Sequence, residues 1–192
     1  MSKILRSYTG GAGFPAYAKM TEKADTVILN CVECEPLLKL HRQLLATHTE
    51  EIIQMLDEVR ESFGAKEAVI GIKSEYVTTI KAIEEVIGDF PNVRICALKA
   101  AYPMGDEVVL IYEATGRVIK PGGLPIDENV VVYNVETMYN LYRAVHLNIP
   151  VTNKLVSIVG EIDHPLTVRV PLGTTVKEAI SLAGKQLRIR PM

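Results

Sequence analysis

Short apolar segments rich in β-branched residues alternate with segments of helical periodicity through the first 150 residues, and this alternation most constrains the fold. Strands are predicted at residues 26–29, 68–72, 93–98 and 130–133. Helices are predicted at residues 41–63, 75–87, 106–115 and 136–147. Alternation of this kind builds a parallel sheet. We therefore expect an α/β fold, a Rossmann-like parallel sheet with helices on both faces and ligands at the carboxyl ends of its strands.

The composition changes near Pro150, where a second and smaller unit is predicted. Its elements are strands at residues 154–160 and 166–170 and a helix at 176–183, with Thr174 or Thr175 as the N-cap. These make an incomplete α+β unit, because so few elements cannot enclose a core. We expect a division into residues 1–150 and 151–192, and a chain that is a fragment of a longer protein.

Composition and charge exclude several classes of function. Hydrophobic residues make up 48% of the chain, charged residues 23%, and the net charge is −2. This charge predicts no binding to nucleic acid, and no apolar run approaches the roughly 20 residues that cross a bilayer. Three cysteines fit a reducing, cytoplasmic setting. Contact with a membrane is expected only through partner subunits, without direct insertion.

A glycine-rich segment near the amino terminus suits a phosphate group. Gly10, Gly11 and Gly13 lie close together, and Lys19 follows them. Glycines let backbone N–H groups approach an anion, and a lysine adds positive charge. The segment predicts a site for a phosphate-bearing cofactor. The alternative is an ordinary turn or linker, because glycine runs are common in both.

The segment after the first predicted strand carries an amide and two carboxylates, Asn30, Glu33 and Glu35. At a strand end these groups would accept hydrogen bonds from ribose hydroxyls or hold the edge of a flavin. A carboxylate at a ribose 2′-hydroxyl would also repel a 2′-phosphate, which favours NAD over NADP. The alternative is a solvated acidic loop.

Two further segments lie before the third and fourth predicted helices. Tyr102 and Gly105 suit a flat ring lying against the backbone, whereas the helix dipole alone explains Asp106 and Glu107. Asn134 precedes a helix whose free N–H groups would receive a phosphate, and ordinary capping explains it equally well. Both segments join the candidate cofactor site.

The sequence predicts neither catalytic side chains nor a metal site. Cys31 and Cys34 form a lone C-x-x-C pair without two further zinc ligands, and we interpret them as ordinary thiols rather than a metal or redox centre. Cys96 is interpreted as a packed thiol. The four histidines are interpreted as surface or loop residues. These features fit hydride transfer, in which cofactors supply the reactive atoms.

Taken in order, these segments resemble the FMN-binding core of the complex I flavoprotein subunit. They are still more similar to the C subunit of the Rnf electron-transport complex and to the cobalamin-reductase-like proteins of bacterial microcompartments. The resemblance rests on the glycine-rich segment with Lys19 and on residues 30–36, 102–107, 115–117, 121–125 and 134–137. Residues 154–183 resemble the start of the β-grasp domain named SLBB, for soluble-ligand-binding β-grasp.

The resemblance implies roles for the residues of the candidate site. The FMN phosphate would be held by Gly10, Gly11, Gly13 and Lys19. Further contacts with FMN would come from Asn30, Glu33, Gly105, Asp106 and Asn134. NADH would be contacted by Phe14, which stacks on the adenine, and by Glu35 and Glu107. Tyr102 belongs to the same cofactor-binding motif as Gly105.

The function implied is that of an electron-transfer flavoprotein subunit, which oxidises NADH through bound FMN and passes electrons to an iron–sulfur acceptor. No C-x-x-C-x-x-C run follows residue 184. Iron–sulfur clusters are therefore expected only in a missing carboxy-terminal part or in a partner. The partners implied are NADH and either the other subunits of an electron-transfer complex or an electron-accepting enzyme.

Three alternatives stay open. A cobalamin-reductase-type flavoprotein would deliver electrons to cobalamin. A binding or scaffolding module would keep the fold without a cofactor, which fits Glu22 at the position of an adenine-stacking aromatic residue in the complex I subunit. An NAD-binding domain without flavin would bind nucleotide as a colourless protein.

Overall fold

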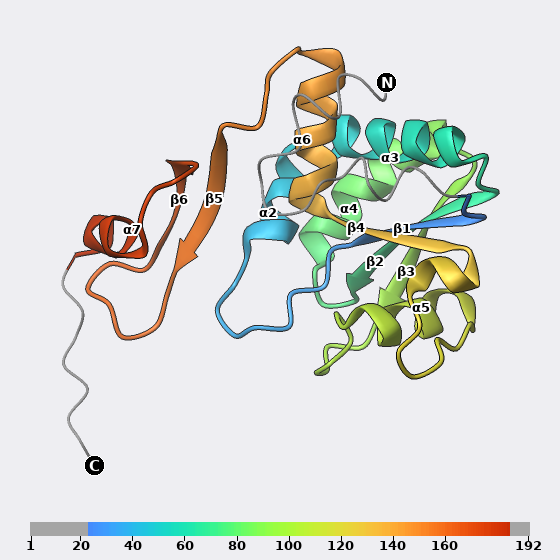
Figure 1. Ribbon diagram of the computed structural model, residues 1–192, viewed down its shortest axis with the longest axis horizontal. Coiled ribbons are helices and arrows are strands. Elements are labelled where there is room, and N and C mark those ends of the chain that lie inside the picture. Colours follow the sequence, from blue (N-terminus) through green and yellow to red (C-terminus); the bar gives the residue numbers. More distant parts are fainter. Residues whose placement is uncertain (1–22, 185–192) are drawn as a thin grey trace.

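The computed structural model describes residues 23–184, which form two β-sheets and the helices that pack on them (Figure 1). The larger sheet is parallel and has the strand order β3-β2-β1-β4. Its strands are β1 (Thr26–Asn30), β2 (Glu67–Lys73), β3 (Val93–Leu98) and β4 (Val130–Asn134). The predicted α/β fold with a parallel sheet is confirmed.

The chain changes direction across this sheet between β1 and β4. From β1 it runs outward to β2 and β3 through α2 (Leu40–Thr47), α3 (Thr49–Phe63) and α4 (Val77–Val86). It then returns through α5 (Glu107–Thr115) and places β4 on the other side of β1. Ligands of open α/β sheets bind at such a switch point, outside the carboxyl ends of the strands. The topology therefore predicts a ligand site at the carboxyl ends of β1 and β4.

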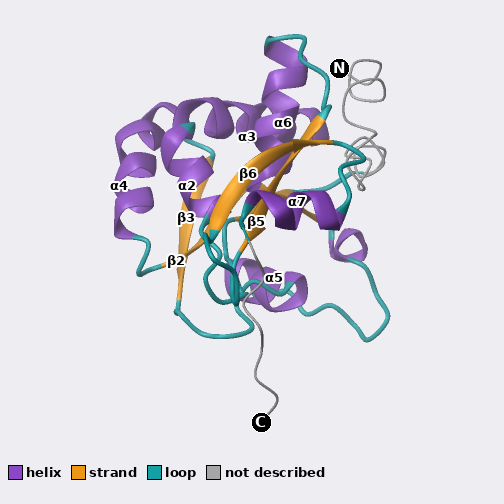
Figure 2. Cartoon of the chain, turned by 90° about the vertical axis from the view of Figure 1, so that its left-hand side faces the viewer, coloured by secondary structure: helices purple, strands orange, loops and turns teal. Residues whose placement is uncertain are grey.

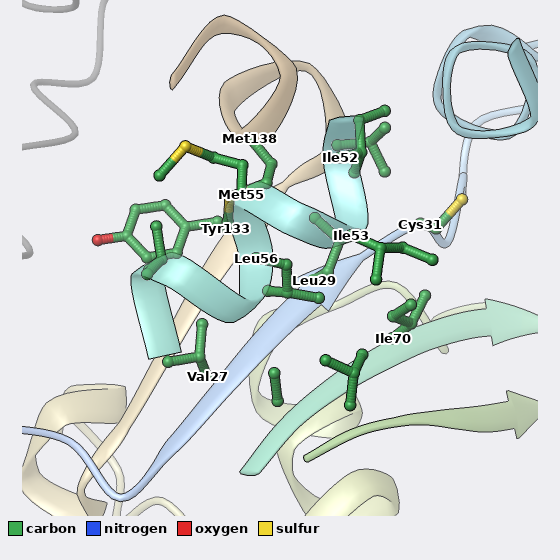
Figure 3. Packing of buried hydrophobic residues seen from close by; sticks show 14 of the residues in the cluster. Val27, Leu29, Cys31, Ile52, Ile53, Met55, Leu56, Ile70, Tyr133 and Met138 are labelled. Carbon is green, nitrogen blue, oxygen red and sulfur yellow. The ribbon is translucent and has the colours of Figure 1, made fainter. Parts of the chain in front are cut away.

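Helices cover both faces of the parallel sheet, as predicted. The helices α2, α3, α4 and α6 (Val135–His146) lie on one face, and α5 lies on the other (Figure 1). Val27 and Leu29 of β1 pack beneath Met55 and Leu56 of α3 (Figure 3), whereas Ile28 belongs to the core on the α5 side. Both faces of β1 are thus buried, which explains its unbroken run of apolar residues.

The prediction of a single helix at residues 41–63 is wrong, because α2 and α3 are separate helices that meet at His48. The backbone of His48 leaves the helical region, with φ −126° and ψ 44°. The hydroxyl of Thr49 donates to the carbonyl of Leu45 at 2.8 Å, the carbonyl that the Thr49 amide would use in a continuous helix. The ring of His48 also stacks on Tyr139 of α6, with 4.2 Å between centroids. Tertiary packing therefore fixes the break.

The other helix ends lie within two residues of their predicted positions. Gly64 ends α3 in the left-handed conformation, with φ 67°, as predicted for a glycine that follows a helix. Two short 3-10 helices, η2 (Ile87–Asp89) and η3 (Pro125–Glu128), lead into β3 and β4. The sequence signals for helix termination are therefore sound wherever the local chain decides the end.

The smaller sheet pairs β5 (Asn153–Ile158) with β6 (Leu166–Pro171) in antiparallel orientation, and α7 (Val176–Leu182) packs on it (Figure 2). A separate apolar cluster holds these elements together; its buried members are Ile158, Ile162, Ala179 and Ala183. Thr175 caps α7 and forms a reciprocal capping box with Glu178. The two strands and the helix predicted here are all present.

Candidate functional site

The candidate site lies at the carboxyl edge of the parallel sheet, at the switch point between β1 and β4. Asn30 ends β1 and is the register partner of Asn134 at the end of β4. The segment after β1 and the segment before α5 meet beside Asn30, through Gly105 and Cys34. The fold thus brings together three polar segments that are far apart in the sequence.

Asn30 joins two of these segments through its side-chain amide. The residue is only 9% exposed. Its Nδ2 donates to the carbonyl of Gly105 at 3.0 Å, and its Oδ1 accepts from the N–H of Val32 at 2.9 Å. An asparagine amide has two donors and two acceptor positions, so one of each remains for a ligand after these bonds. Asn30 therefore positions the loops and retains hydrogen-bonding capacity.

Gly105 is held against the loop that follows β1. Its N–H donates to the Sγ of Cys34 at 3.1 Å. A Cβ at this position would lie 2.5 Å from the carbonyl oxygen of Val32 and 2.7 Å from the Sγ of Cys34. A glycine is needed here because the backbone of Val32 and the thiol of Cys34 approach so closely. Cys34 is a structural partner that the sequence did not reveal, because a lone thiol carries no signal of its contacts.

Glu33 belongs to the same loop and is 6% exposed. Its Oε1 accepts from the N–H of His41 at 2.9 Å, at the start of α2. Its Oε2 is buried 3.7 Å from the Nε of Arg42 and has no hydrogen-bond partner within residues 23–184. Burial raises the pKa of Glu33 above its usual value. The neighbouring Glu35 is exposed.

The interpretation of all four histidines as surface or loop residues is wrong for His41. This residue belongs to α2 and is half-buried, and burial lowers the pKa of its imidazole. His146, at the end of α6, pairs with Glu58 of α3 and stacks on Tyr142. The helical periodicity of α2 is carried by its leucines, so the sequence pattern places them and leaves His41 without an assigned face.

The segment before α5 places its residues in different environments. Asp106 is the N-cap of α5, and its Oδ1 accepts from the N–H of Val108 at 3.0 Å and from that of Val109 at 3.3 Å. Glu107 lies in the first turn of α5, and Tyr102 is 84% exposed. The capping of α5 therefore gives Asp106 a structural role. The exposed ring of Tyr102 has no such role among the contacts that the structure describes.

The start of α6 contributes an exposed amide and a buried carboxylate. Asn134 is the N-cap residue but makes no capping hydrogen bond through its side chain. Glu136, two residues later, is 5% exposed and accepts hydrogen bonds from the ammonium of Lys154 and the N–H of Leu155, the latter at 3.0 Å. No sequence pattern indicates this contact, because it depends on how β5 packs against α6.

Five predicted cofactor residues lie outside the described residues, namely Gly10, Gly11, Gly13, Phe14 and Lys19. Glu22 lies outside them as well. The described part of the chain contains the other residues predicted to bind FMN or NADH: Asn30, Glu33, Glu35, Tyr102, Gly105, Asp106, Glu107 and Asn134.

Within residues 23–184 no group of three or more side chains is arranged to hold a metal ion. The three cysteines are free thiols, and Cys31 is fully buried with a raised pKa because of that burial. In the same part of the chain, no helix has the length and apolar character needed to cross a bilayer.

Comparison with known proteins identifies relatives over most of the chain. Residues 8–143 match the Nuo51 FMN-binding domain, and residues 155–184 match the SLBB domain. The cobalamin reductase PduS of Citrobacter freundii is 39% identical over 175 residues, which cover 91% of this chain and 38% of that protein. The C subunit of the Na(+)-translocating ferredoxin:NAD(+) oxidoreductase complex of Acetobacterium woodii is 31% identical over 180 residues, covering 91% of this chain and 41% of that protein. The chain thus spans about two fifths of these curated relatives.

The fold is shared with a solved enzyme structure. The NAD+-reducing NiFe hydrogenase in its H2-reduced state superposes with a TM-score of 0.73 at 22% identity, covering 94% of this chain and 38% of that chain. Its air-oxidized state gives a TM-score of 0.75. The likeness concerns the fold, and the sequence matches establish the relationship. The chain therefore belongs to the Nuo51 FMN-binding domain family, with an SLBB domain following in residues 155–184.

Proposed function

We propose that this chain is the FMN-binding part of an electron-transfer flavoprotein subunit that oxidises NADH. The observation that carries the proposal is the contact of Asn30 with Gly105 at the switch point of the sheet, in a chain that matches an FMN-binding domain. Ligands of such sheets bind at that point. Bound FMN would accept a hydride from NADH and release the electrons singly.

The chain's own residues would bind and orient the cofactor. Asn30 holds the loops on either side of the switch point and keeps one donor and one acceptor for the flavin. The first N–H groups of α6 have no intrahelical partners and are not capped by the Asn134 side chain, so they suit the phosphate. Gly10, Gly11, Gly13 and Lys19 would complete the phosphate site. Glu33 and Asp106 would act indirectly, by fixing the starts of α2 and α5.

Three residues are proposed for NADH because they lie at the same edge of the sheet as the residues proposed for FMN. Glu35 and Tyr102 are exposed, and Glu107 begins α5 directly after the Asp106 cap. Phe14 would stack on the adenine. Carboxylates here would favour NADH over NADPH by repelling a 2′-phosphate.

The test is a visible spectrum after incubation with FMN and removal of the excess, followed by NADH under anaerobic conditions. We expect a retained flavin band that NADH bleaches. A retained band that NADH leaves unchanged would contradict the assignment of NADH as donor. Loss of all flavin would contradict the proposal and favour a binding or scaffolding module, and nucleotide binding by that colourless protein would favour the NAD-binding alternative.

The phosphate assignment has its own variant. Lys19→Ala should weaken FMN binding by about 1.5–3 kcal/mol, the range for a hydrogen bond to a charged group. Lys23→Ala removes the same charge from an exposed neighbouring position and should leave FMN affinity unchanged. Riboflavin, which lacks the phosphate, should bind both variants equally. Equal FMN affinity of Lys19→Ala and the parent would contradict the role of Lys19.

We propose an iron–sulfur centre, in the rest of the subunit or in a partner subunit, as the electron acceptor. Cobalamin is a second candidate, favoured by the 39% identity to the cobalamin reductase PduS against 31% to the Acetobacterium woodii protein. Reduction of each acceptor by NADH and the FMN-loaded protein, followed by absorbance, separates the two. Faster reduction of cobalamin than of an iron–sulfur protein would exclude the first candidate.

We also propose the division of the chain into a cofactor domain at residues 1–150 and an SLBB unit at residues 151–192. The separate sheets and the separate apolar cluster around Ile158 support this division.

A further inference from the structure

A buried carboxylate at the start of α6 is hydrogen-bonded to β5 of the smaller, antiparallel sheet, which we call the second sheet. The side chain of Glu136 is 7% exposed, and both of its oxygens are bonded to β5. One oxygen accepts from the Lys154 ammonium and the other from the N–H of Leu155. The Lys154 side chain is 46% exposed. The charge that is removed from water is therefore that of Glu136, and the second sheet supplies its counter-charge.

Other charged groups around Glu136 do not replace Lys154. Arg143 and Arg169 line the same cleft between α6 and the second sheet, but neither is bonded to Glu136. His41 interacts electrostatically with both Glu136 and Lys154, and burial lowers the pKa of its imidazole, which favours the neutral form. Among the described residues that surround it, Lys154 is the cation in direct contact with this carboxylate.

The position of Glu136 matters for an anionic cofactor. It lies in the first turn of α6, two residues after Asn134, where the N–H groups proposed for the FMN phosphate begin. The partial positive charge of a helix N-terminus favours anions, and a second negative charge in that turn opposes a bound phosphate. A Glu136 carboxylate without a counter-ion would therefore weaken the binding of the cofactor phosphate at the N-terminus of α6.

We infer that Lys154 of the second sheet is a positioning residue for the flavin site, because it neutralises Glu136 and so raises the affinity of the start of α6 for the FMN phosphate. This inference rests on the proposed FMN-binding function. Lys154 acts through Glu136 and does not touch the cofactor. The SLBB unit would then take part in flavin binding from outside the cofactor domain.

A purely structural joint between the two sheets predicts a different pattern. If the contact only holds the units together, removing either partner should affect the flavin site in the same direction. If charge neutralisation matters, removing Lys154 should weaken FMN binding, whereas removing the charge of Glu136 should not. Lys154→Met leaves a buried, uncompensated negative charge, whereas Glu136→Gln removes that charge and keeps an acceptor for the Leu155 N–H.

The experiment is a titration of the full chain with FMN and with riboflavin, followed by flavin fluorescence. Lys154→Met should weaken FMN binding about 5- to 10-fold and change riboflavin binding less than about 2-fold, because riboflavin lacks the phosphate. Glu136→Gln should bind FMN at least as tightly as the parent. In the Glu136→Gln background, Lys154→Met should have no further effect.

Two controls accompany these variants. Lys154→Arg retains the positive charge and should restore FMN affinity to that of the parent. Lys177→Met removes the same charge from α7, on the far side of the second sheet from α6, and should leave FMN affinity unchanged (Figure 1). Thermal melting of each variant checks its folding. If Lys154→Met does not fold, the FMN affinity of Glu136→Gln still tests the inference, because a weaker affinity than that of the parent would contradict it.

Equal weakening of FMN binding by Lys154→Met and Glu136→Gln would overturn the inference, because it indicates a packing joint. Equal loss of riboflavin and FMN affinity in Lys154→Met would overturn it as well. If the parent binds FMN and Lys154→Met binds it equally well, this inference fails while the proposed function stands. If the parent binds neither flavin, both fail.

Discussion

Gly105 cannot carry a side chain unless its neighbours move. Backbone and thiol atoms already occupy the space that a side chain would need. The same residue accepts from Asn30 and donates to Cys34, so its displacement would disturb both loops at the switch point. Its role follows from its neighbours, because a glycine in a turn is common and conveys little in the sequence.

Gly105→Ala should lower the free energy of unfolding by about 1–3 kcal/mol, the usual cost of overpacking. It should also weaken FMN binding, because the loop can only relieve the clash by moving away from Val32 and Cys34. Urea unfolding and FMN titration measure the two effects. Gly88→Ala is the matched control, since a Cβ there meets nothing within 4 Å. Equal stability of the two variants would contradict the close approach.

The buried carboxyl of Glu33 should make stability depend on pH. Its pKa is raised in the folded protein by burial, so the folded state holds this proton to a higher pH than the unfolded state does. Its contribution to stability is present in full below the unfolded value near 4.5 and is lost as pH rises through the folded pKa.

Glu33→Gln removes this titration and keeps an acceptor for the N–H of His41. Relative to the parent, the variant should gain stability as pH rises above 4.5, by about 1.4 kcal/mol for each unit by which burial raises the pKa. Urea unfolding at a series of pH values upward from the unfolded value near 4.5 measures the difference. A parallel course of Glu33→Gln and the parent would refute the assignment.

At the scale of elements, the start of α5 depends on one side chain. Asp106 accepts from two N–H groups of the first turn, which would otherwise lack partners within the helix. Asp106→Ala should therefore cost about 1 kcal/mol of stability, and Asp106→Asn should cost little, because asparagine caps helices as well as aspartate does. Thermal melting measures both. If both variants lose the same stability, the negative charge and not the cap is what matters.

The elements that the sequence predicts well are those decided by the local chain. The apolar run at residues 93–98 forms β3 with the same bounds, and Gly64 ends α3, because strand propensity and left-handed glycine act over a few residues. The break at His48 escapes prediction because it depends on a stacking contact with Tyr139, in a helix much later in the chain.

The candidate site was predictable as segments but not as contacts. Asn30 and Asn134 each follow a buried strand, and the parallel register places them side by side. The bond between Cys34 and Gly105 and the burial of Glu136 need the packing of elements that no local pattern encodes. The roles of the predicted cofactor residues remain predictions, since no ligand contact is described for them.

At the scale of the whole molecule, the Glu136 carboxylate should contribute to stability only when the second sheet is present. In the full chain, Glu136→Gln should lower the free energy of unfolding by about 1.5–3 kcal/mol, because a charged hydrogen bond to Lys154 is lost. In a chain ending at residue 150, the same change should alter stability by less than about 0.5 kcal/mol, because the carboxylate is then solvated. Chemical denaturation of the four proteins gives the comparison. An equal cost in both chains would show that Glu136 acts within α6.

The switch point between β1 and β4 also has a consequence for the order of folding. The inner strand β1 pairs with β2, the next strand in the sequence, and with β4, the strand of this sheet most distant from it in the sequence. Pairing across long stretches of chain is slow, because loop-closure entropy must be overcome before the contact forms. We expect flavin quenching in stopped-flow refolding to appear only with the slowest phase, after most helical signal has returned; quenching in the earliest phase would contradict this order. The cofactor would then bind only to chains whose sheet is complete, so that flavin occupancy reports the end of folding.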